Sequence, residues 1–399
     1  MKKRLIILCL LLALLLPCLC VPAAAASNEI TVYNWGQYIS DGSDGYVDVI
    51  EEFEAETGIK VHYLTYDSNE SLYTKLKTGG STYDVIIPSD YMIGRLIAED
   101  MLEPLNFDNI PNYRYVDEAF KNQAYDPENR YSVPYTWGTV GVIYNTKYVD
   151  EDDVGGWDLL WNSKYAGKIL MFDNCRDAFA IAESLLGYSL NTQDPTELRN
   201  CASLLSEQKP ILQGHVMDQI YDKMIREEAW IAPYYAGDYL YMLEENEDLG
   251  FYFPEEGFNV FIDAACIPKG CTNQEGAEAF INFLCKPEIC GENLEYLGYS
   301  APISEAKNYM DPEVAESEIA YPSDEVLANS ESFSALDLET SQLMDSLWLS
   351  VKTSGSDTTG YLIAGAALLL AAIALTVILK LRRRRKLARR GISRRTAQP

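Results

Sequence analysis

Strand-like and helix-like segments alternate from residue 30 to residue 105 of this chain. The strand-like segments are short and apolar. The helix-like segments place apolar residues three and four positions apart, and two of them end at glycine. In order, the six segments cover residues 30–35, 46–58, 59–66, 68–80, 83–91 and 93–105. This β-α-β-α-β-α order predicts an α/β fold, with parallel strands joined by right-handed crossovers.

Strand-like and helix-like segments continue to alternate up to about residue 290. Residues 131–145 and 258–268 have strand patterns, and residues 176–187 have the pattern of an amphipathic helix that ends at a glycine. Residues 229–246 predict a strand, a turn and a helix, and residues 273–290 predict one helix. Because about 330 residues exceed what a single core usually serves, two lobes are expected.

Both ends of the chain have the composition of targeting segments. Residues 1–26 combine a basic start, an apolar stretch and small residues, which is typical of a signal peptide; a lipid-modified Cys18 or Cys20 is the less favoured alternative. Residues 361–381 are apolar and long enough to span a bilayer, and the arginine-rich residues 382–399 predict a cytoplasmic tail. Residues 353–360 are the expected linker. The protein is therefore predicted to be exported and bound to the bacterial cell membrane, with its main domain outside.

The segment between these ends is strongly acidic. Residues 27–360 hold 19 of the 32 Lys and Arg residues and all 60 Asp and Glu residues. Such a surface repels nucleic acid and attracts cations. No nucleic-acid partner is therefore expected, and the arginine-rich tail is better explained as a membrane anchor that meets anionic lipid.

The cysteines and histidines give no metal motif. Six cysteines follow the signal peptide, and an exported protein can pair them as disulfides, although fifteen full pairings are possible. None has C-x-x-C spacing, and His62 and His215 are the only histidines. The sequence therefore predicts no metal centre. The six are Cys175, Cys201, Cys266, Cys271, Cys285 and Cys290.

Aromatic residues and carboxylates gather where predicted strands end. In an open α/β sheet a ligand lies outside the carboxyl ends of the strands, so these residues are candidates for one site. They are Trp35 and Tyr38, Ser89 and Tyr91, Asp173 and Asp177, Tyr235 and Asp238, and Asp263.

The candidate residues favour binding over catalysis. They include no Ser-His or Cys-His pair, and the chain has no GxxxxGK[ST] or GxGxxG loop, so no nucleotide cofactor is predicted. Paired carboxylates can serve a glycoside hydrolase, which stays the enzymatic alternative. Aromatic walls with carboxylates suit an aliphatic chain that ends in ammonium groups, through cation–π contacts and charge-assisted hydrogen bonds. This is the chemistry that recognises a polyamine.

Several longer stretches carry a more specific pattern. They are YNWGQYI, FEAETGIKVHYLTYDSNESLYTKLKTGGSTYDVIIPSDY, YSVPYTWGTVGVIYN, GWDLLWNSKYAGKILMFD, NQEGAEAFINFLCKPE and EYLGYSAPI. Together they resemble the spermidine/putrescine-binding proteins of ABC importers, over nearly all of residues 29–352. The resemblance implies a two-lobed, type II periplasmic-binding-protein fold with a ligand cleft between the lobes. The lobes are expected at 27–138 with 264–308 and at 139–263 with 309–352.

The resemblance also implies which residues meet the ligand. Asp238 and Asp263 are expected to hold one ammonium group and Asp177 to approach another. Asn174 and Gln37 stand where relatives often carry aspartate, and Tyr235 and Phe261 replace tryptophans, so the preferred polyamine stays open. The full expected set is Trp35, Tyr38, Ser89, Tyr91, Asp177, Tyr235, Asp238, Asp263 and Tyr299.

The predicted function is non-enzymatic and needs no cofactor. The protein is expected to capture putrescine or spermidine outside the cell and to deliver it to the permease subunits of an ABC importer. Two alternatives stay open: a membrane-tethered polyamine sensor, and the same fold with another small solute. The short tail leaves no room for a signalling domain, and the carboxylates disfavour an anionic ligand.

Overall fold

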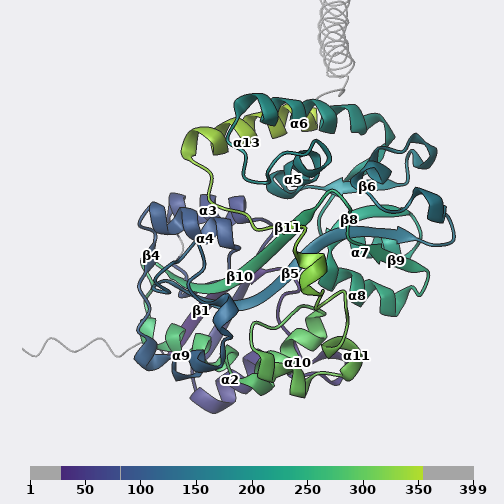
Figure 1. The fold of residues 1–399 in the computed structure, drawn as a ribbon. Helices are drawn as coiled ribbons and strands as arrows, with labels where there is room; N and C mark the ends of the chain where they lie inside the picture. Colours follow the sequence, from purple (N-terminus) through teal and green to yellow (C-terminus); the bar gives the residue numbers. More distant parts are fainter. Residues whose placement is uncertain (1–27, 81, 354–399) are drawn as a thin grey trace, which may run out of the picture. The chain divides into compact units, whose positions relative to one another are not determined.

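The computed structural model describes residues 28–80 and 82–353, which form an α/β fold (Figure 1). The chain divides into two compact units, residues 1–348 and residues 349–399. The sheet, the cavity and the contacts described below all belong to the first unit. Of the second unit only residues 349–353 are described, as the end of α13 (Leu338–Thr353).

The elements follow one another in mixed order, with short 3₁₀ helices in several connections. The strands are β1 (Glu29–Trp35), β2 (Lys60–Tyr66), β3 (Val85–Ile86), β4 (Leu102–Glu103), β5 (Ser132–Asn145), β6 (Ile169–Phe172), β7 (Leu212–Val216), β8 (Ile231–Tyr235), β9 (Leu249–Tyr252), β10 (Phe258–Pro268) and β11 (Ser330–Glu331). The other α-helices are α2 (Val49–Thr57), α3 (Asn69–Thr78), α4 (Asp90–Ala98), α5 (Cys175–Leu185), α6 (Pro195–Gln208), α7 (Gln219–Ile225), α8 (Ala236–Glu245), α9 (Gln274–Leu284), α10 (Pro287–Leu297), α11 (Pro312–Ala315) and α12 (Asp324–Leu327).

The strands form one hydrogen-bonded path in the order β2-β1-β3-β10-β5-β8-β6-β7, with β4, β9 and β11 paired beside it. β1 is parallel to β2 and β3, and β6 is parallel to β7 and β8, so the path holds two parallel groups. The long strands β5 and β10 are antiparallel to each other and run through the middle of the fold between the two groups (Figure 1). The parallel strands predicted between residues 30 and 105 are confirmed, since β1 pairs in parallel with β2 and β3.

Local signals explain where several helices begin and end. Ser68 caps α3, because its Oγ accepts a hydrogen bond from the backbone N–H of Ser71 at 3.1 Å. The helix predicted over 93–105 was placed too late: α4 begins at Asp90 and ends at Ala98. The chain then turns through a left-handed Asp100 (φ 56°), which lets β4 pair with β10. The helix predicted over 273–290 is two helices, because Pro287 fits only a first helical turn and therefore starts α10.

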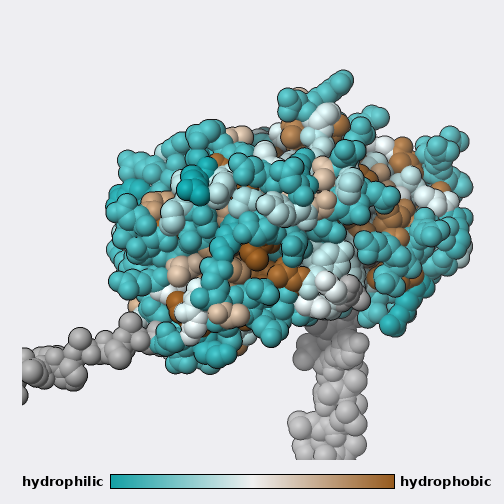
Figure 2. Space-filling view, turned by 90° about the horizontal axis from the view of Figure 1, so that it is seen from below, coloured by the Kyte–Doolittle hydropathy of each residue, from teal (hydrophilic) through white to brown (hydrophobic). Residues whose placement is uncertain are grey.

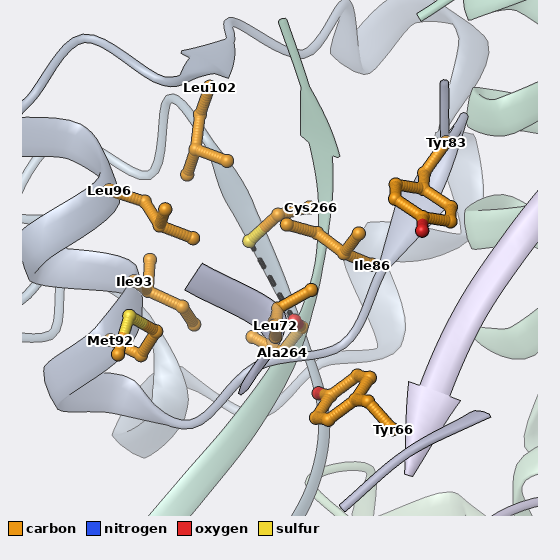
Figure 3. Packing of buried hydrophobic residues seen from close by; sticks show 10 residues of the cluster. All are labelled: Tyr66, Leu72, Tyr83, Ile86, Met92, Ile93, Leu96, Leu102, Ala264 and Cys266. Carbon is orange, nitrogen blue, oxygen red and sulfur yellow. Dashed lines mark hydrogen bonds between the residues drawn. The ribbon is translucent and has the colours of Figure 1, made fainter. Parts of the chain in front are cut away.

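A buried hydrophobic cluster packs α3 and α4 against β3 and β10 (Figure 3). Ala264 and Cys266 of β10 belong to this cluster, so the strand is held by the core immediately beyond Asp263. Loss of a large side chain here would open a cavity and destabilise the fold by about 2–5 kcal/mol. The cluster consists of Tyr66, Leu72, Tyr83, Ile86, Met92, Ile93, Leu96, Leu102, Ala264 and Cys266.

The outer surface is mainly hydrophilic on the face seen in Figure 2, in keeping with the acidic composition. Within residues 28–80 and 82–353, no helix combines the length and the apolar character that a bilayer crossing needs. The predicted signal peptide, membrane helix and basic tail, and the linker from residue 354 onward, lie outside the described residues. All six cysteines in the described part are free thiols.

Candidate functional site

One cavity gathers residues from both parallel groups of strands and from the helices that follow them. Its empty volume is about 720 Å³, counted together with the solvent at its open mouth. All nine residues expected from the sequence line it: Trp35, Tyr38, Ser89, Tyr91, Asp177, Tyr235, Asp238, Asp263 and Tyr299. The structure therefore brings every member of the expected set to one place.

Asp263 lies in the middle of β10. The pairing of β10 with β5 changes register between Asp263 and Ala264, an irregularity that re-aims a side chain. Tyr38 Oη donates to Asp263 Oδ2 at 2.7 Å. Asp263 Oδ1 is buried and has no hydrogen-bond partner in the described part of the chain. Burial raises the pKa of Asp263 to about 6, although the nearby hydroxyls of Ser89 and Tyr38 lower it.

Asp238 lies in the first turn of α8, between two tyrosines. Tyr299 Oη donates to Asp238 Oδ2 at 2.8 Å, and Tyr221 Oη donates to Asp238 Oδ1. Burial raises the pKa of Asp238 to about 7, although the two phenols lower it. The Tyr299 ring packs directly on Gly237, where a Cβ would lie 2.4 Å from Tyr299 Cδ2. Glycine at 237 therefore allows Tyr299 to reach Asp238.

Asp177 lies in the first turn of α5. Asn174 caps this helix, because its Oδ1 accepts from the backbone N–H of Arg176 at 3.0 Å and of Asp177 at 3.5 Å. Tyr235 Oη donates to Asp177 Oδ2 at 2.7 Å. Burial raises the pKa of Asp177 to about 7, and the hydrogen bond from Tyr235 lowers it. Asn174, which lines the cavity, thus also positions the aspartate.

Aromatic rings form a connected wall of the cavity. Tyr38 meets Tyr299 edge to face, with 5.2 Å between ring centroids, and Tyr235 meets Phe261 at 5.4 Å in the same manner. Phe261 and Tyr299 are 6.3 Å apart, which joins the two pairs. Edge-to-face contacts of this kind are favourable, so these rings support one another in the wall.

Asn69 links two of the expected lining residues, Ser89 and Tyr91. Its Nδ2 donates to Ser89 Oγ at 3.0 Å and to Tyr91 Oη at 3.1 Å. Tyr91 Oη in turn donates to Glu70 Oε1 at 2.9 Å. Trp35 also lines the cavity, and its ring centroid lies 4.8 Å from that of Tyr66.

Several lining residues were missed at the sequence level. Asp67 follows β2 and Asp218 follows β7, so the rule that ligands bind at strand ends finds both once β7 is recognised. The polar sequence LQGHV gives β7 no strand pattern, which hid Asp218. Tyr221 on α7 carried no signal at all. The other lining residues outside the expected set include Gly36, Tyr66, Asn69, Met217, Tyr234, Asn259 and Phe333.

Two residues considered at the sequence level lie away from the cavity lining. Asp173 is exposed, and Asn174 rather than Asp173 caps α5. Gln37 is exposed, with a left-handed backbone (φ 50°) that carries the chain between Trp35 and Tyr38. The departure at Gln37 therefore does not alter the lining.

The lining combines aromatic surface with one sign of charge. Asp67, Asp177, Asp218, Asp238 and Asp263 line the cavity, and no Lys, Arg or His is among the described residues that do so. In the same part of the chain, no group of three or more His, Cys, Asp or Glu side chains could hold a metal ion. Such a lining suits an organic cation with an apolar body, since carboxylates pair with its charges and rings cover its carbon atoms.

Comparison with known sequences places this arrangement among binding proteins. The profile of the bacterial extracellular solute-binding protein family matches residues 48–322. The chain is 33% identical over 306 residues to the spermidine/putrescine-binding periplasmic protein of Escherichia coli K12, which covers 76% of the chain and 86% of that relative. It is 31% identical over 350 residues to the putrescine-binding periplasmic protein SpuD of Pseudomonas aeruginosa, covering 83% and 94%.

Solved structures agree with the sequence comparison. The spermidine/putrescine ABC transporter substrate-binding protein PotD of Streptococcus pneumoniae aligns with a TM-score of 0.69 and 39% identity, over 82% of this chain and 98% of that chain. The Tp0655 lipoprotein of Treponema pallidum aligns with a TM-score of 0.71 and 28% identity, over 81% and 99%. The fold is therefore the α/β fold of periplasmic binding proteins. The chain belongs to the bacterial extracellular solute-binding protein family, in the group of the spermidine/putrescine-binding proteins of ABC transporters.

Proposed function

We propose that the cavity binds a polyamine, putrescine or spermidine, and that the protein delivers it to the permease of an ABC importer. One observation carries the proposal: three buried aspartates, Asp177, Asp238 and Asp263, each accept a hydrogen bond from a tyrosine in an aromatic cavity. Each aspartate offers a fixed acceptor for an ammonium group, and the rings cover the methylene chain. The names of the relatives, which specify spermidine and putrescine, support the same ligand class.

The proposed mechanism is closure of two lobes around the ligand, without any chemical change. We take the lobes as 27–138 with 264–308 and 139–263 with 309–352, hinged where β5 and β10 cross between them. A bound polyamine contacts Asp177 from one lobe and Tyr38 from the other, and so favours the closed form. Closure excludes water and strengthens each charge pair. The closed protein then presents both lobes to the permease.

We also propose that residues 361–381 tether the protein to the cell membrane, beside its transporter. The support is the sequence of this segment and the arginine-rich residues that follow it. Removal of residues 361–399 is expected to release the protein into the medium, with polyamine binding unchanged. Retention of the shortened protein in the membrane would contradict the tether.

The ligand is tested by calorimetry on the full-length chain, purified in a mild detergent. Putrescine or spermidine should bind, whereas a neutral sugar and a neutral amino acid should not. Asp263→Asn should weaken amine binding by about 30-fold or more, because a buried charge pair loses one partner. Asp152→Asn, which changes an exposed residue away from the cavity, serves as the control. A folded protein that binds no amine, or an Asp263→Asn variant within twofold of the unmodified protein, would contradict the proposal.

A further inference from the structure

Two aspartates at the mouth of the cavity come from opposite ends of the sheet. Asp67 follows β2 and Asp218 follows β7, and these are the first and last strands of the hydrogen-bonded path. Both residues nevertheless line the same cavity. They are exposed, whereas Asp177, Asp238 and Asp263 are only 6%, 8% and 4% exposed. The cavity thus has a buried acidic floor and a separate acidic mouth.

The two mouth aspartates are close enough to repel each other. Although Asp218 is exposed at the surface, it is partly desolvated in the cavity, and this partial burial and the negative charge of Asp67 together raise its pKa. Asp218 in turn raises the pKa of Asp238, so the acidic lining continues from the mouth to the floor. Asp218 also lies against the backbone after β1, since a Cβ at Gly36 would be 3.2 Å from Asp218 Oδ2. In the described part of the chain, neither side chain has an ion-pair partner.

The floor already offers acceptors for the ammonium groups of a short diamine. Asp263 Oδ1 is buried and has no partner among residues 28–80 and 82–353, while Asp177 and Asp238 are fixed by tyrosines. An amine with a further charge needs another acceptor, and Asp218 and Asp67 are the remaining carboxylates among the described lining residues. A cation between these two carboxylates replaces their repulsion with attraction, which is an interaction that a ligand confined to the floor cannot make.

We propose that Asp67 and Asp218 form an additional ammonium subsite that selects longer polyamines, with three or four amino groups, over diamines. This inference rests on the proposed polyamine binding and adds the basis of its chain-length preference. The preference for longer polyamines therefore depends on Asp67 and Asp218, which are separate from the aspartates that hold the ammonium groups of a diamine.

The test is calorimetry on the full-length protein with putrescine, spermidine and spermine at about 0.15 M salt, where distant charges are screened. Asp67→Asn and Asp218→Asn should each weaken spermidine or spermine binding by about fivefold, and putrescine binding should change by less than twofold. Asp222→Asn is the matched control, because Asp222 lies in α7 four positions after Asp218, is exposed, pairs with Arg226 at the surface and does not line the cavity.

Mono-acetylated spermidine gives a second readout, because acetylation removes one charge and keeps the chain. Acetylation at the end that reaches the mouth should weaken binding to the unmodified protein, and this penalty should shrink in the Asp67→Asn, Asp218→Asn double variant. Equal losses for putrescine and spermidine, or no loss for either, would overturn the subsite. An unmodified protein that binds no amine would instead overturn the proposed function, so the two failures are distinguishable.

Discussion

Tyrosine hydroxyls fix the cavity aspartates before a ligand arrives. Tyr38 holds Asp263, Tyr235 holds Asp177, and Tyr299 holds Asp238. A neutral donor orients a carboxylate without neutralising its charge, so the acceptor is preorganised and still needs a cation. A lysine or arginine in the same place would satisfy the charge and compete with the ligand.

The pH dependence of binding follows from the raised pKa values of these carboxyls. Asp177 and Asp238 have pKa values of about 7 and Asp263 of about 6 in the ligand-free protein, chiefly because they are buried. An ammonium group binds the ionised form, so binding below pH 7 must displace protons. Putrescine affinity should fall by at least about tenfold from pH 8 to pH 6. Calorimetry at pH 6 in two buffers of different ionisation enthalpy should show proton release, and an affinity that rises as the pH falls would contradict this assignment.

Gly237→Ala tests whether the placement of Tyr299 matters apart from charge. The new Cβ would overlap the Tyr299 ring, and the displaced hydroxyl would no longer reach Asp238. Overpacking of this kind costs about 1–3 kcal/mol. Amine affinity should fall while every carboxylate is retained, and tyrosine fluorescence should report the changed surroundings of the ring. Ala236→Gly, one position earlier on α8, is the control, and an unchanged affinity in Gly237→Ala would show that Tyr299 is dispensable.

At the scale of elements, the start of α5 both stabilises the helix and delivers Asp177 to the cavity. Asn174→Ala removes the side-chain cap and should lower the free energy of unfolding by about 1 kcal/mol. It should also weaken amine binding, because Asp177 loses the contact that fixes its backbone. Asn174→Asp keeps the cap and serves as the comparison for stability only, because it adds a carboxylate to the cavity lining. Urea denaturation and calorimetry measure the two effects, and an unchanged unfolding midpoint for Asn174→Ala would exclude the capping role.

The elements that carry strong periodicity could be predicted from sequence, and so could the residues at their ends. β10 has the predicted bounds, 258–268, because its apolar run is long and bordered by glycine and proline. The partners of the site residues could not be predicted: Tyr38 and Asp263 are 225 positions apart, and only the tertiary fold joins them. Asp218 and Tyr221 were not predicted as site residues for another reason: the polar strand β7 before them has no alternating apolar pattern.

At the scale of the whole molecule, the cavity aspartates oppose folding of the ligand-free protein. Burial raises the pKa of Asp238 above its unfolded value of about 4, so the folded state favours the protonated form. The stability it contributes is present at low pH and is lost as the pH rises to about 7. Asp238→Asn should therefore stabilise the ligand-free protein at pH 8 by about 1–3 kcal/mol, with little gain near pH 4.

Thermal unfolding at several pH values, without and with excess putrescine, measures this effect. The variant should melt higher than the unmodified protein at pH 8 when both are ligand-free. Putrescine should raise the melting temperature of the unmodified protein by mass action and that of the variant much less. A variant that is less stable at pH 8 would show that the two tyrosine contacts outweigh the buried charge.

The absence of Lys, Arg and His from the described lining of the cavity also affects the choice of buffer for purification. Five aspartates around aromatic rings make the cavity a small weak-acid cation exchanger, which should attract small organic cations without a negative charge of their own. Protonated Tris, common in purification and crystallisation, is such a cation, and the ammonium ion carries the same charge without the carbon body. Protein prepared in such buffers should hold the buffer cation in the cavity. A measured polyamine affinity would then include the cost of displacing that cation. Phosphate buffer, with dialysis under mild acid to discharge the carboxylates, would provide the empty protein.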